Sequence, residues 1–428
     1  MELEKFLGEK MKNYNEFIAD LSSLVAINSV QGEKKRGKPF GEGPASALNT
    51  FLDIANRMGF KTKNYKNYIG EISVGKGEEI GVIGHLDIVP AGDGWDFDPF
   101  TLTEKDGYLY GRGVEDDKGP TLACLYALKE VIDEGYTFNR KIRFFAGTNE
   151  ETGWKDVEFF NKRKGGFPKY GFSPDGGFPA TYAEKGMYEF DFILPPLKNF
   201  RDIKGGTVIN AVCGTCSIKP LTEPKGYEKF GLVFDGERLV SKGVSAHGSM
   251  PHKGKNAILP LLQYLLECGE EVKDVIDCFF NDCHGVFQME NEQGRVTFSP
   301  DLIKEENGQI KLSCDVRIPA PFTVYEVCDK VCKFGYNFKV TERHPPMCTE
   351  KDGWFVNALV SAYNSVLNCN EKPKSIGGST FARAFENGCS IGATLGESLA
   401  HQPNERVLIE DYEKMHQIYK QIFINLAK

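Results

Sequence analysis

The sequence predicts an α/β fold with a mostly parallel central sheet, interrupted by an inserted α+β domain. In the first 180 residues, short apolar runs alternate with segments of helical periodicity, which is typical of a parallel sheet. After about residue 184, segments alternate between apolar and polar positions, as antiparallel strands with one exposed face do. The first pattern returns from about residue 349. A chain of 428 residues is also too long for one ordinary core, so two domains are expected.

Four segments define the first domain. Residues 79–84 are a continuous apolar run and predict a buried strand. Residues 119–134 have helical periodicity, and Pro120 falls in the first turn, where its missing N–H costs little. Residues 140–146 predict a second strand and residues 169–173 a shorter one. This order of strand, helix and strand favours parallel pairing.

The middle of the chain has a different pattern. Residues 187–194 and 310–318 alternate as exposed antiparallel strands do, and residues 256–279 predict one long helix. Helices are then expected near 353–367 and 410–427. We therefore assign residues 1–183 and 349–428 to one domain and residues 184–348 to a domain inserted into it.

Charge and cysteine usage exclude several classes of protein. The net charge of -8 argues against general binding to nucleic acid or to anionic membranes. The N-terminus has no secretory h-region, and no run of about 18 apolar residues predicts a membrane span. The 12 scattered cysteines favour free thiols in a reducing cytoplasm. A structural zinc site or a redox pair is the alternative for two local pairs, Cys213 with Cys216 and Cys278 with Cys283-His284.

Histidine and carboxylate side chains gather in four short motifs. Three follow predicted strands, and one precedes the helix at 119–134. Because ligands of open α/β sheets bind at the carboxyl ends of the strands, these side chains are expected to converge on one rim. The motifs are His85-Leu86-Asp87, Glu115-Asp116-Asp117, Asn149-Glu150-Glu151 and Ser173-Pro174-Asp175.

The residue types in these motifs favour a pair of divalent cations. Histidine and carboxylates are ligands for such ions, and carboxylates crowded together without a cation would repel one another. A carboxylate also has two oxygens with which to bridge two ions about 3.5–4 Å apart. Taken singly, each motif has a plainer explanation, such as a surface ion pair, a helix start or a turn. Their joint occurrence at strand ends favours the metal site.

In their order and sequence, these motifs resemble the two-zinc exopeptidases, the family of carboxypeptidase G, peptidase T, aminoacylases and succinyl-diaminopimelate desuccinylase. The resemblance extends from about residue 15 to the C-terminus and is greatest to the peptidase V-type (β-Ala-Xaa) dipeptidases. It implies a zinc-exopeptidase-like catalytic domain with a lid domain inserted, and the length of that lid implies a monomer. The matching runs are 85–90, Trp95 with 98–100, 110–113, 116–120, 150–153, 377–383 and 401–405.

The resemblance implies five metal ligands. His85 and Asp175 would bind one ion, Glu151 and His401 would bind the other, and Asp116 would bridge both. The ions are expected to be zinc, with manganese or cobalt as alternatives that the same ligands accept. The peptide bond after Asp116 is implied to be cis.

The resemblance implies three further residues that take part in catalysis. The resemblance implies that Glu150 is the general base, and that Asp87 fixes the ring of His85, as metal-bound histidines usually require. Because Glu150 must point at water while its neighbour binds a metal, the pair should lie where the strand ends. His247, in the run 245–251, matches a lid histidine that reaches the substrate carbonyl.

The remaining matches concern the substrate carboxylate. Arg317 matches an arginine that holds this group, together with the backbone around residues 378–380. Asn210 matches a lid asparagine, but Ala-Val-Cys follows it where many relatives have Val-Pro. The implied substrate-binding residues are therefore Arg317, Asn210, Gly378, Ser379 and Thr380.

The implied function is metal-dependent hydrolysis of a small peptide, most simply a dipeptide. Three alternatives stay open. An N-acyl amino acid deacylase would use the same ions with a different acyl pocket. An inactive binding relative would lack a ligand or the base, all of which are present. A structural metalloprotein would have a closed, cysteine-rich site.

Overall fold

The computed structural model describes residues 11–163 and 165–427, and the chain forms two compact units. Unit 1 contains the residues up to Tyr182, the segment Cys348–Lys374 and the residues from Thr380 onward. Unit 2 contains Ala183–Met347 and Ser375–Ser379. The sequence places Ser375–Ser379 in the first domain, whereas in the structure this segment belongs to unit 2. A hydrogen bond of 3.0 Å from Arg317 Nη1 to the carbonyl of Gly377 is one of the contacts that hold it there.

A nine-stranded sheet, formed mostly by residues of unit 1, has the order β1-β2-β6-β3-β7-β21-β8-β19, with β20 paired to β8. Neighbours are parallel from β6 to β21, and the pairs β1–β2, β2–β6 and β21–β8 are antiparallel. The sheet is therefore mixed, with a parallel centre. The strands are β1 (Lys61–Tyr65), β2 (Ile69–Val74), β3 (Glu79–His85), β6 (Lys141–Gly147), β7 (Tyr170–Gly176), β8 (Thr181–Glu184), β19 (Met347–Cys348), β20 (Lys374–Ile376) and β21 (Asn387–Gly392).

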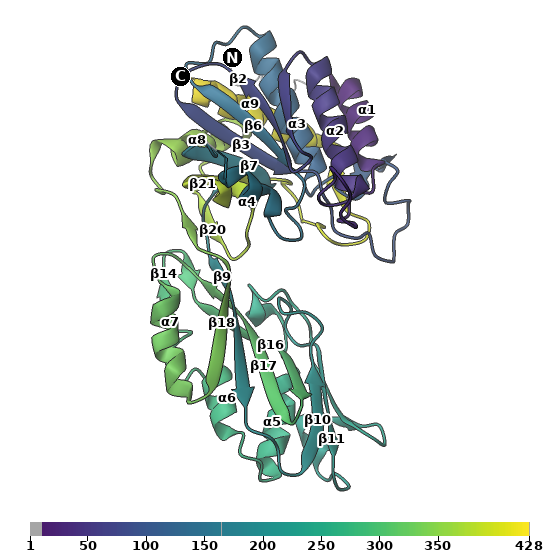
Figure 1. Ribbon diagram of the computed structural model, residues 1–428, viewed down its shortest axis with the longest axis vertical. Helices are drawn as coiled ribbons and strands as arrows, with labels where there is room; N and C mark the ends of the chain where they lie inside the picture. Colours follow the sequence, from purple (N-terminus) through teal and green to yellow (C-terminus); the bar gives the residue numbers. More distant parts are fainter. Residues whose placement is uncertain (1–10, 164, 428) are drawn as a thin grey trace. The chain divides into compact units, whose positions relative to one another are not determined.

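Helices cover both faces of this sheet (Figure 1). Phe144 and Phe145 are consecutive on β6 and point to opposite faces, as strand residues must. The ring centroid of Phe144 lies 6.0 Å from that of Phe51 on α2. The ring centroid of Phe145 lies 5.2 Å from that of Phe160 on α4. The helices of unit 1 are α1 (Tyr14–Val25), α2 (Glu42–Arg57), α3 (Lys118–Asp133), α4 (Lys155–Asn161), η5 (Phe381–Ala384), α8 (Trp354–Leu367) and α9 (Ile409–Ala427). A small sheet, β22-β5-β4, joins β4 (Thr103–Lys105), β5 (Tyr108–Tyr110) and β22 (Arg406–Leu408).

The predicted elements of unit 1 are confirmed. The strands expected at 79–84 and 140–146 are β3 and β6, and the helix expected at 119–134 is α3. The helices expected near 353–367 and 410–427 are α8 and α9. The short strand expected at 169–173 continues to residue 176, so β7 carries one of the predicted ligands within it.

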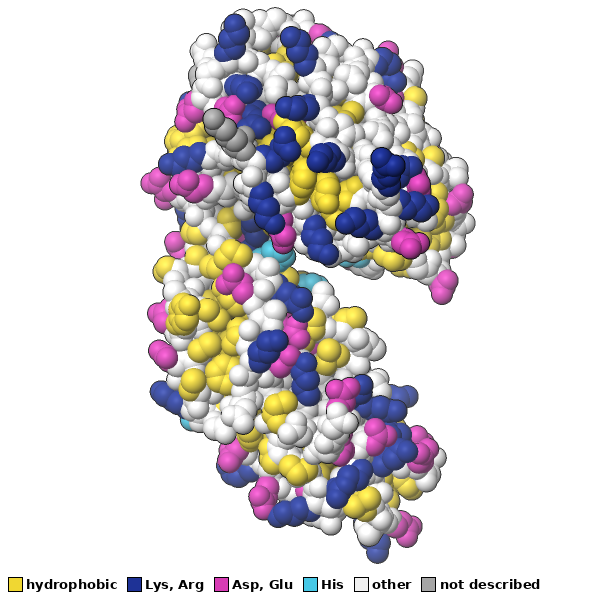
Figure 2. Space-filling model, viewed as in Figure 1, with side chains coloured by type: hydrophobic (Ala, Val, Ile, Leu, Met, Phe, Trp, Pro, Cys, Tyr) yellow, Lys and Arg dark blue, Asp and Glu magenta, His cyan; other side chains and the backbone are white. Residues whose placement is uncertain are grey.

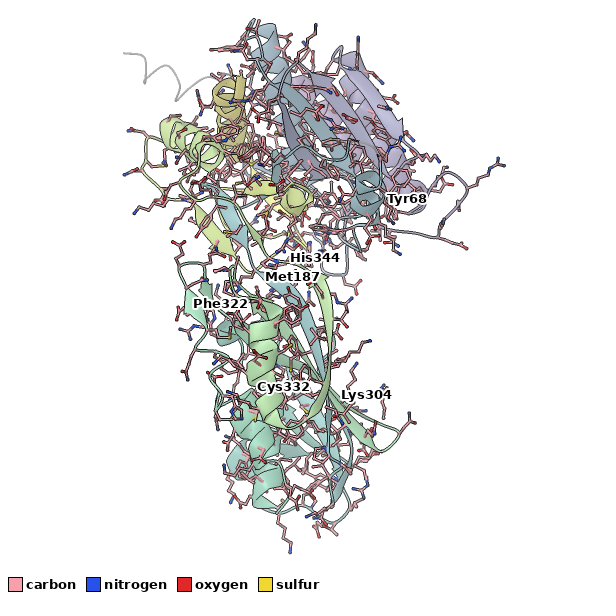
Figure 3. All side chains as sticks on the ribbon, turned by 60° about the vertical axis from the view of Figure 1, so that its left-hand side comes forward. Tyr68, Met187, Lys304, Phe322, Cys332 and His344 are labelled. Carbon is pink, nitrogen blue, oxygen red and sulfur yellow. The ribbon has the colours of Figure 1, made fainter. Side chains whose placement is uncertain are left out.

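Unit 2 is built on an eight-stranded sheet in the order β12-β13-β11-β10-β16-β17-β9-β18. The predicted strands at 187–194 and 310–318 are its inner members β9 and β17, which pair antiparallel. Met187 and His344 are register partners on β9 and β18, and Figure 3 shows them side by side. The strands are β9 (Gly186–Leu194), β10 (Phe200–Gly205), β11 (Thr215–Pro220), β12 (Val233–Phe234), β13 (Leu239–Lys242), β16 (Thr297–Glu306), β17 (Gln309–Ile318) and β18 (Asn337–His344), with a hairpin of β14 (Glu290–Asn291) and β15 (Gly294–Arg295).

The prediction of one long helix at 256–279 is wrong. Two helices occupy this range, α5 (Ile258–Glu267) and α6 (Lys273–Phe279). Gly269 lies between them at φ +82°, a conformation that ends a helix and that glycine adopts without a steric penalty. The other helices of unit 2 are η2 (Tyr227–Phe230), η3 (Pro251–Lys253), α7 (Val324–Val331) and η4 (Cys332–Phe334).

The surface of unit 2 carries both signs of charge. Lys and Arg alternate with Asp and Glu over the face shown in Figure 2, and hydrophobic side chains gather on the same face near β14 and α7. In the described part of the chain, no helix has the length and apolar character needed to cross a membrane.

Candidate metal centre

The predicted ligands of unit 1 meet at the carboxyl ends of the parallel strands. His85 is the last residue of β3, and Asp175 lies one residue before the end of its neighbour β7. Glu150 and Glu151 lie in the turn beyond β6, on the other side of β3, as the prediction for this pair requires. Asp116 comes from the loop before α3, which begins at Lys118.

The side chains form two groups that share Asp116. His85 Nε2 lies 3.0 Å from Asp116 Oδ1 and 3.7 Å from Asp175 Oδ2. His401 Nε2 lies 2.9 Å from Asp116 Oδ2 and 3.2 Å from Glu151 Oε2. In each group, the ligand atoms all lie within 4.8 Å of one another. Each oxygen of Asp116 therefore faces a different group.

The pKa values of these side chains are shifted by burial and by the neighbouring charges. Burial tends to raise the pKa of Asp116, but His401 and His85 outweigh it and hold the pKa far below its usual range. Burial, with Asp116 nearby, raises the pKa of Asp175 well above normal. Hydrogen bonds to Asp116 and Glu151 raise the pKa of His401 to about 11. The acids and histidines of this cluster therefore strongly perturb one another's pKa values.

These residues fit a pair of divalent ions. Histidine and carboxylate are the donor types such ions take, and both histidines present Nε2 to the acids. Glu151 Oε1 is buried and has no hydrogen-bond partner, although buried carboxylate oxygens are normally satisfied. A cation beside it would satisfy this oxygen and allow the neighbouring acids to ionise together.

Asp87 supports the site from behind. Its side chain is 1% exposed, and its carboxylate lies 3.6 Å from His85 Nδ1, which also contacts the Asp87 carbonyl at 3.0 Å. The two oxygens of the same carboxylate accept the backbone N–H groups of Glu150 and Glu151, both at 3.1 Å. One buried acid therefore orients a histidine and the turn that carries both glutamates.

The loop around the Asp116–Asp117 bond is fixed to the sheet. This peptide bond is cis, as predicted. Asp117 Oδ2 accepts the backbone N–H of His85 at 3.1 Å and the hydroxyl of Thr121 at 2.7 Å. A side chain at Gly84 would meet Thr121 Oγ1 at 1.7 Å, so the approach of α3 to β3 depends on that glycine.

Glu405 and Arg112 are structural supports that we did not predict. Glu405 is fully buried, and its Oε1 accepts the backbone N–H groups of Gly113, Glu115 and Asp116 at 2.9, 2.8 and 3.2 Å. Its Oε2 accepts Arg112 Nη1 at 2.5 Å. Burial raises the pKa of Glu405 to about 7, with Arg112 opposing the effect. The sequence contained one indication of these two residues: Arg112 lies in the matching run 110–113, and Glu405 lies in the matching run 401–405.

Unit 2 brings together the segments that carry two predicted site residues, Asn210 and His247. Ala211, next to Asn210, forms a backbone bridge with His247. The N–H of Gly248 donates to the carbonyl of Asn210 at 2.7 Å. The side chain of His247 is exposed, and its Nδ1 lies 2.7 Å from Ser249 Oγ. The segments that carry Asn210 and His247 are therefore joined through their backbones.

Arg317 is buried, with 1% of its surface exposed, and its guanidinium already donates hydrogen bonds within the protein. Its Nε and Nη2 each donate to Asp315 at 2.6 Å, and its Nη1 donates to the Gly377 carbonyl at 3.0 Å. A guanidinium has five N–H groups, so these bonds leave two for another acceptor. The structure thus gives Arg317 a supporting role for the segment at Gly377 that the sequence did not indicate.

The three residues predicted to bind through their backbone fall in both units. Gly378 and Ser379 belong to unit 2, and Thr380 belongs to unit 1. Ser379 Oγ is buried without a hydrogen-bond partner, which marks it as a group able to take a ligand. Thr380 Oγ1 accepts the N–H of Ala382 at 3.2 Å and so caps η5.

Comparison with known proteins identifies the chain as a metallopeptidase. The profile of Peptidase family M20/M25/M40 matches residues 81–425, and the chain belongs to that family. Its relatives include proteins of Staphylococcus aureus (strain MW2) and Staphylococcus saprophyticus, 30% and 31% identical, each provisionally named a dipeptidase. Both alignments cover 98% of this chain and 99% of the relative.

Solved structures share the fold. Human carnosine dipeptidase 1 is 17% identical with a TM-score of 0.61, over 100% of this chain and 99% of that one. Aminopeptidase PepT from Bacillus cereus is 14% identical with a TM-score of 0.62, over 98% of this chain and 100% of that one. The predicted fold class and family are therefore confirmed.

Proposed function

We propose that the protein hydrolyses the amide bond of dipeptides in a reaction that depends on two divalent cations. The observation that carries this proposal is the pair of histidine–carboxylate groups that share Asp116. The provisional names of the staphylococcal relatives support a dipeptide as the substrate class. Zinc is the expected metal, and manganese and cobalt suit the same donors.

The distances between the side chains support the proposed division of the ligands between two ions. His85, Asp116 and Asp175 would hold one ion, and Asp116, Glu151 and His401 would hold the other. When bound, such ions lower the pKa of water toward about 7 and polarise a carbonyl group. The remaining requirements of the reaction fall to residues that do not bind metal.

Glu150 is suited to act as the general base. It lies in the turn beyond β6 and outside both ligand groups, so its carboxylate is not needed to hold either ion. Burial, with further repulsion from Glu151, raises its pKa well above the ordinary value, which favours a group that must accept a proton and then give it up. It would take a proton from water and pass it to the leaving amine.

Residues of unit 2, together with Thr380 of unit 1, are proposed to recognise the substrate. The exposed imidazole of His247 would donate to the oxyanion that forms at the scissile carbonyl, a role in which one donor is worth about 2.7–4 kcal/mol. Arg317, with Asn210 and the backbone of Gly378, Ser379 and Thr380, would bind the terminal carboxylate. Binding of the terminal carboxylate would restrict the enzyme to short substrates with a free C-terminus.

The test is a substrate panel with controlled metal content. The protein is stripped with a chelator and supplied with zinc, manganese or cobalt, and each form is assayed on dipeptides and on N-acetyl amino acids. We expect activity on dipeptides that chelation abolishes and metal restores. Activity confined to N-acetyl amino acids would identify a deacylase instead, and activity that survives complete removal of metal would refute the proposal.

A monomer at assay concentration, measured by sedimentation, is expected from the length of unit 2.

A further inference from the structure

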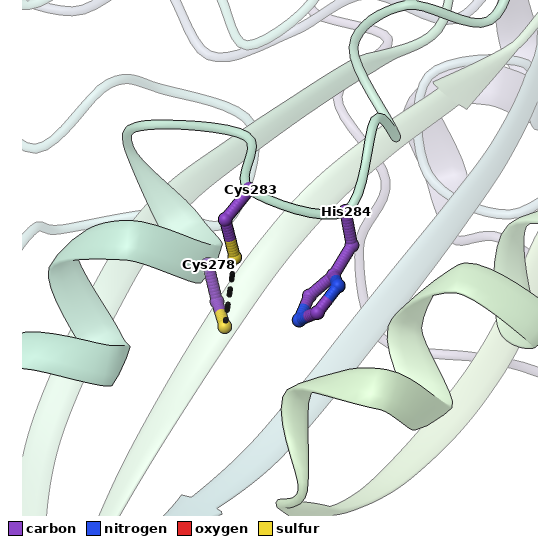
Figure 4. Close-up of side chains that lie close together, drawn as sticks. All are labelled: Cys278, Cys283 and His284. Carbon is purple, nitrogen blue, oxygen red and sulfur yellow. Dashed lines mark hydrogen bonds between the residues drawn. The ribbon is translucent and has the colours of Figure 1, made fainter.

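A second group of metal-ligating side chains lies in unit 2, at the end of α6. Cys278 is in the last turn of this helix, and Cys283 and His284 follow in the loop that leaves it. One ligand atom from each residue lies within 4.8 Å of the others (Figure 4). This group differs in kind from the one in unit 1, because it contains two thiols and no carboxylate.

We propose that Cys278, Cys283 and His284 form a separate binding site for a thiophilic divalent cation, with zinc as its occupant. The two sulfur atoms lie 3.7 Å apart. At a Zn–S distance of about 2.3 Å, two thiolates on one tetrahedral ion are separated by about 3.8 Å. A disulfide would need a separation of about 2.05 Å. The observed spacing therefore matches two sulfurs that share an ion.

The third donor is held in position by its own packing. The ring of His284 stacks on Phe334, with centroids 5.6 Å apart and planes at 27°. Figure 4 shows the ring extending toward the two sulfur atoms. Lys330 Nζ also donates to the carbonyl of His284 at 3.4 Å. A stacked ring loses little freedom when it binds an ion, and zinc accepts nitrogen and sulfur donors together.

The loop between the donors is ordered by internal hydrogen bonds. The N–H of Cys283 donates to the carbonyl of Asp277 at 3.1 Å, and the N–H of Gly285 donates to that of Asp282 at 3.0 Å. Asp282 Oδ1 accepts the N–H of Phe287 at 3.0 Å. The backbone therefore already brings the exposed Cys283 back to the buried Cys278, and an ion could bind without refolding of the loop.

Binding of the ion releases the protons of the two thiols. Each thiol gives its proton to solvent and its sulfur lone pair to the ion, and the imidazole binds in its neutral form. Cys278 is buried, while Cys283 is exposed and leaves an open path to the site. Three protein donors leave one position of a tetrahedral ion for water.

The site adjoins a large cavity in the same unit. Phe279, Phe280 and Phe287, which flank the proposed ligands in sequence, line a cavity of about 1090 Å³. Gly378, one of the proposed substrate-binding residues, lines it as well. An ion that joins α6 to the following loop would brace this wall of the cavity.

Cobalt distinguishes this site from the one in unit 1. Thiolate ligands give Co²⁺ an intense charge-transfer absorption in the near ultraviolet, which histidine and carboxylate ligands do not. The reduced full-length protein, freed of metal under anaerobic conditions, is titrated with Co²⁺ as wild type, C283S, H284A and the control C369S. Cys369 is an exposed thiol outside this group, and Cys283 is exposed as well, so neither substitution disturbs a core. C278S is left out because Cys278 is buried.

We expect the charge-transfer band in wild type and C369S, its loss in C283S, and one bound cobalt fewer per chain in C283S. H284A should shift the band and weaken cobalt binding about 10-fold or more. The absence of the band in wild type would overturn the proposal, as would a band that persists in C283S. A Cys278–Cys283 disulfide formed under mild oxidation, in a protein that shows no band when reduced, would assign the pair to redox chemistry instead. Each readout is independent of peptidase activity.

Discussion

The backbone N–H of Glu150 donates to Asp87 Oδ1 at 3.1 Å, which ties the proposed general base to the strand end that carries His85. The other oxygen of Asp87 accepts the N–H of Glu151 at the same distance. Because Glu150 is proposed to transfer a proton and Glu151 to bind a metal, their directions must be kept distinct. A single buried carboxylate provides that constraint.

Asp87→Asn should therefore weaken both metal binding and turnover. The amide replaces one acceptor oxygen with an NH₂ group, which repels a backbone N–H and no longer supports the ring of His85 as a carboxylate does. Loss of such a support typically costs 10- to 100-fold in metal affinity or activity. Metal titration and kcat measured with saturating metal separate the two effects. Wild-type values for both would show that the backbone alone holds the turn.

Glu150→Gln should abolish most turnover and leave metal binding intact. The amide keeps the size of the side chain but cannot accept a proton from water, and general-base catalysis contributes about 10²- to 10⁴-fold. The measurements are kcat and metal content per chain. Glu386→Gln, an exposed acid of unit 1, is the matched control. Turnover within a few-fold of wild type would remove Glu150 from proton transfer.

His247→Ala should lower kcat by about 10²- to 10³-fold, the range for loss of one oxyanion donor. The side chain is exposed, so the thermal midpoint of unfolding should stay close to that of wild type. Lys253→Ala, at an exposed position on the same segment, should leave kcat unchanged. An effect of His247→Ala on KM alone would assign the imidazole to ground-state binding.

The parts of the site that could be predicted are those placed by strand ends. His85 and Asp175 could be brought together from the sequence because each ends a run with a clear strand pattern, and parallel strands share one rim. The grouping of His401 with Glu151 came from the family resemblance, since His401 lies in a loop without such a pattern.

Other features could not be predicted because the contacts are long-range. Glu405 acts on backbone N–H groups about 290 residues earlier in the chain, and backbone donors leave no mark in a sequence. The antiparallel edge of the unit 1 sheet depends on β2 pairing with β6 instead of β3, which local periodicity does not encode. The sequence already grouped His284 with Cys278 and Cys283, but it did not indicate that the ring of His284 stacks on Phe334.

Glu405→Ala should destabilise unit 1 by about 3–5 kcal/mol. The substitution leaves the Arg112 guanidinium buried without its partner, and removing one member of a buried ion pair costs about this much. It also removes the acceptor for three backbone N–H groups of the loop that carries Asp116. The free energy of unfolding by urea of the metal-free protein measures the effect, with Glu386→Ala as control. A loss below about 1 kcal/mol would show that other contacts hold the loop.

Asp301, in the core of unit 2, should make stability depend on pH. Burial raises the pKa of its carboxyl to about 8, with Asp315 adding to the effect and a hydrogen bond from Ser299 opposing it. Its Oδ2 is buried and has no hydrogen-bond partner. In the unfolded chain an aspartate titrates near pH 4, so between about pH 4 and pH 8 the folded state holds one proton more than the unfolded state.

The sign follows from this difference in bound protons. The free energy of unfolding should fall as the pH rises through that range, by up to about 1.4 kcal/mol per unit from this one group, and level off above the folded pKa. Asp301→Asn cannot ionise and lacks this term. Urea unfolding of both proteins from pH 5 to pH 8 should therefore show the variant gaining stability relative to wild type as the pH rises, while exposed Asp329→Asn shows no such trend. A difference between variant and wild type that is constant with pH would mean that Asp301 is ionised in the folded protein, and that a cation or a water within the core of unit 2 compensates its charge.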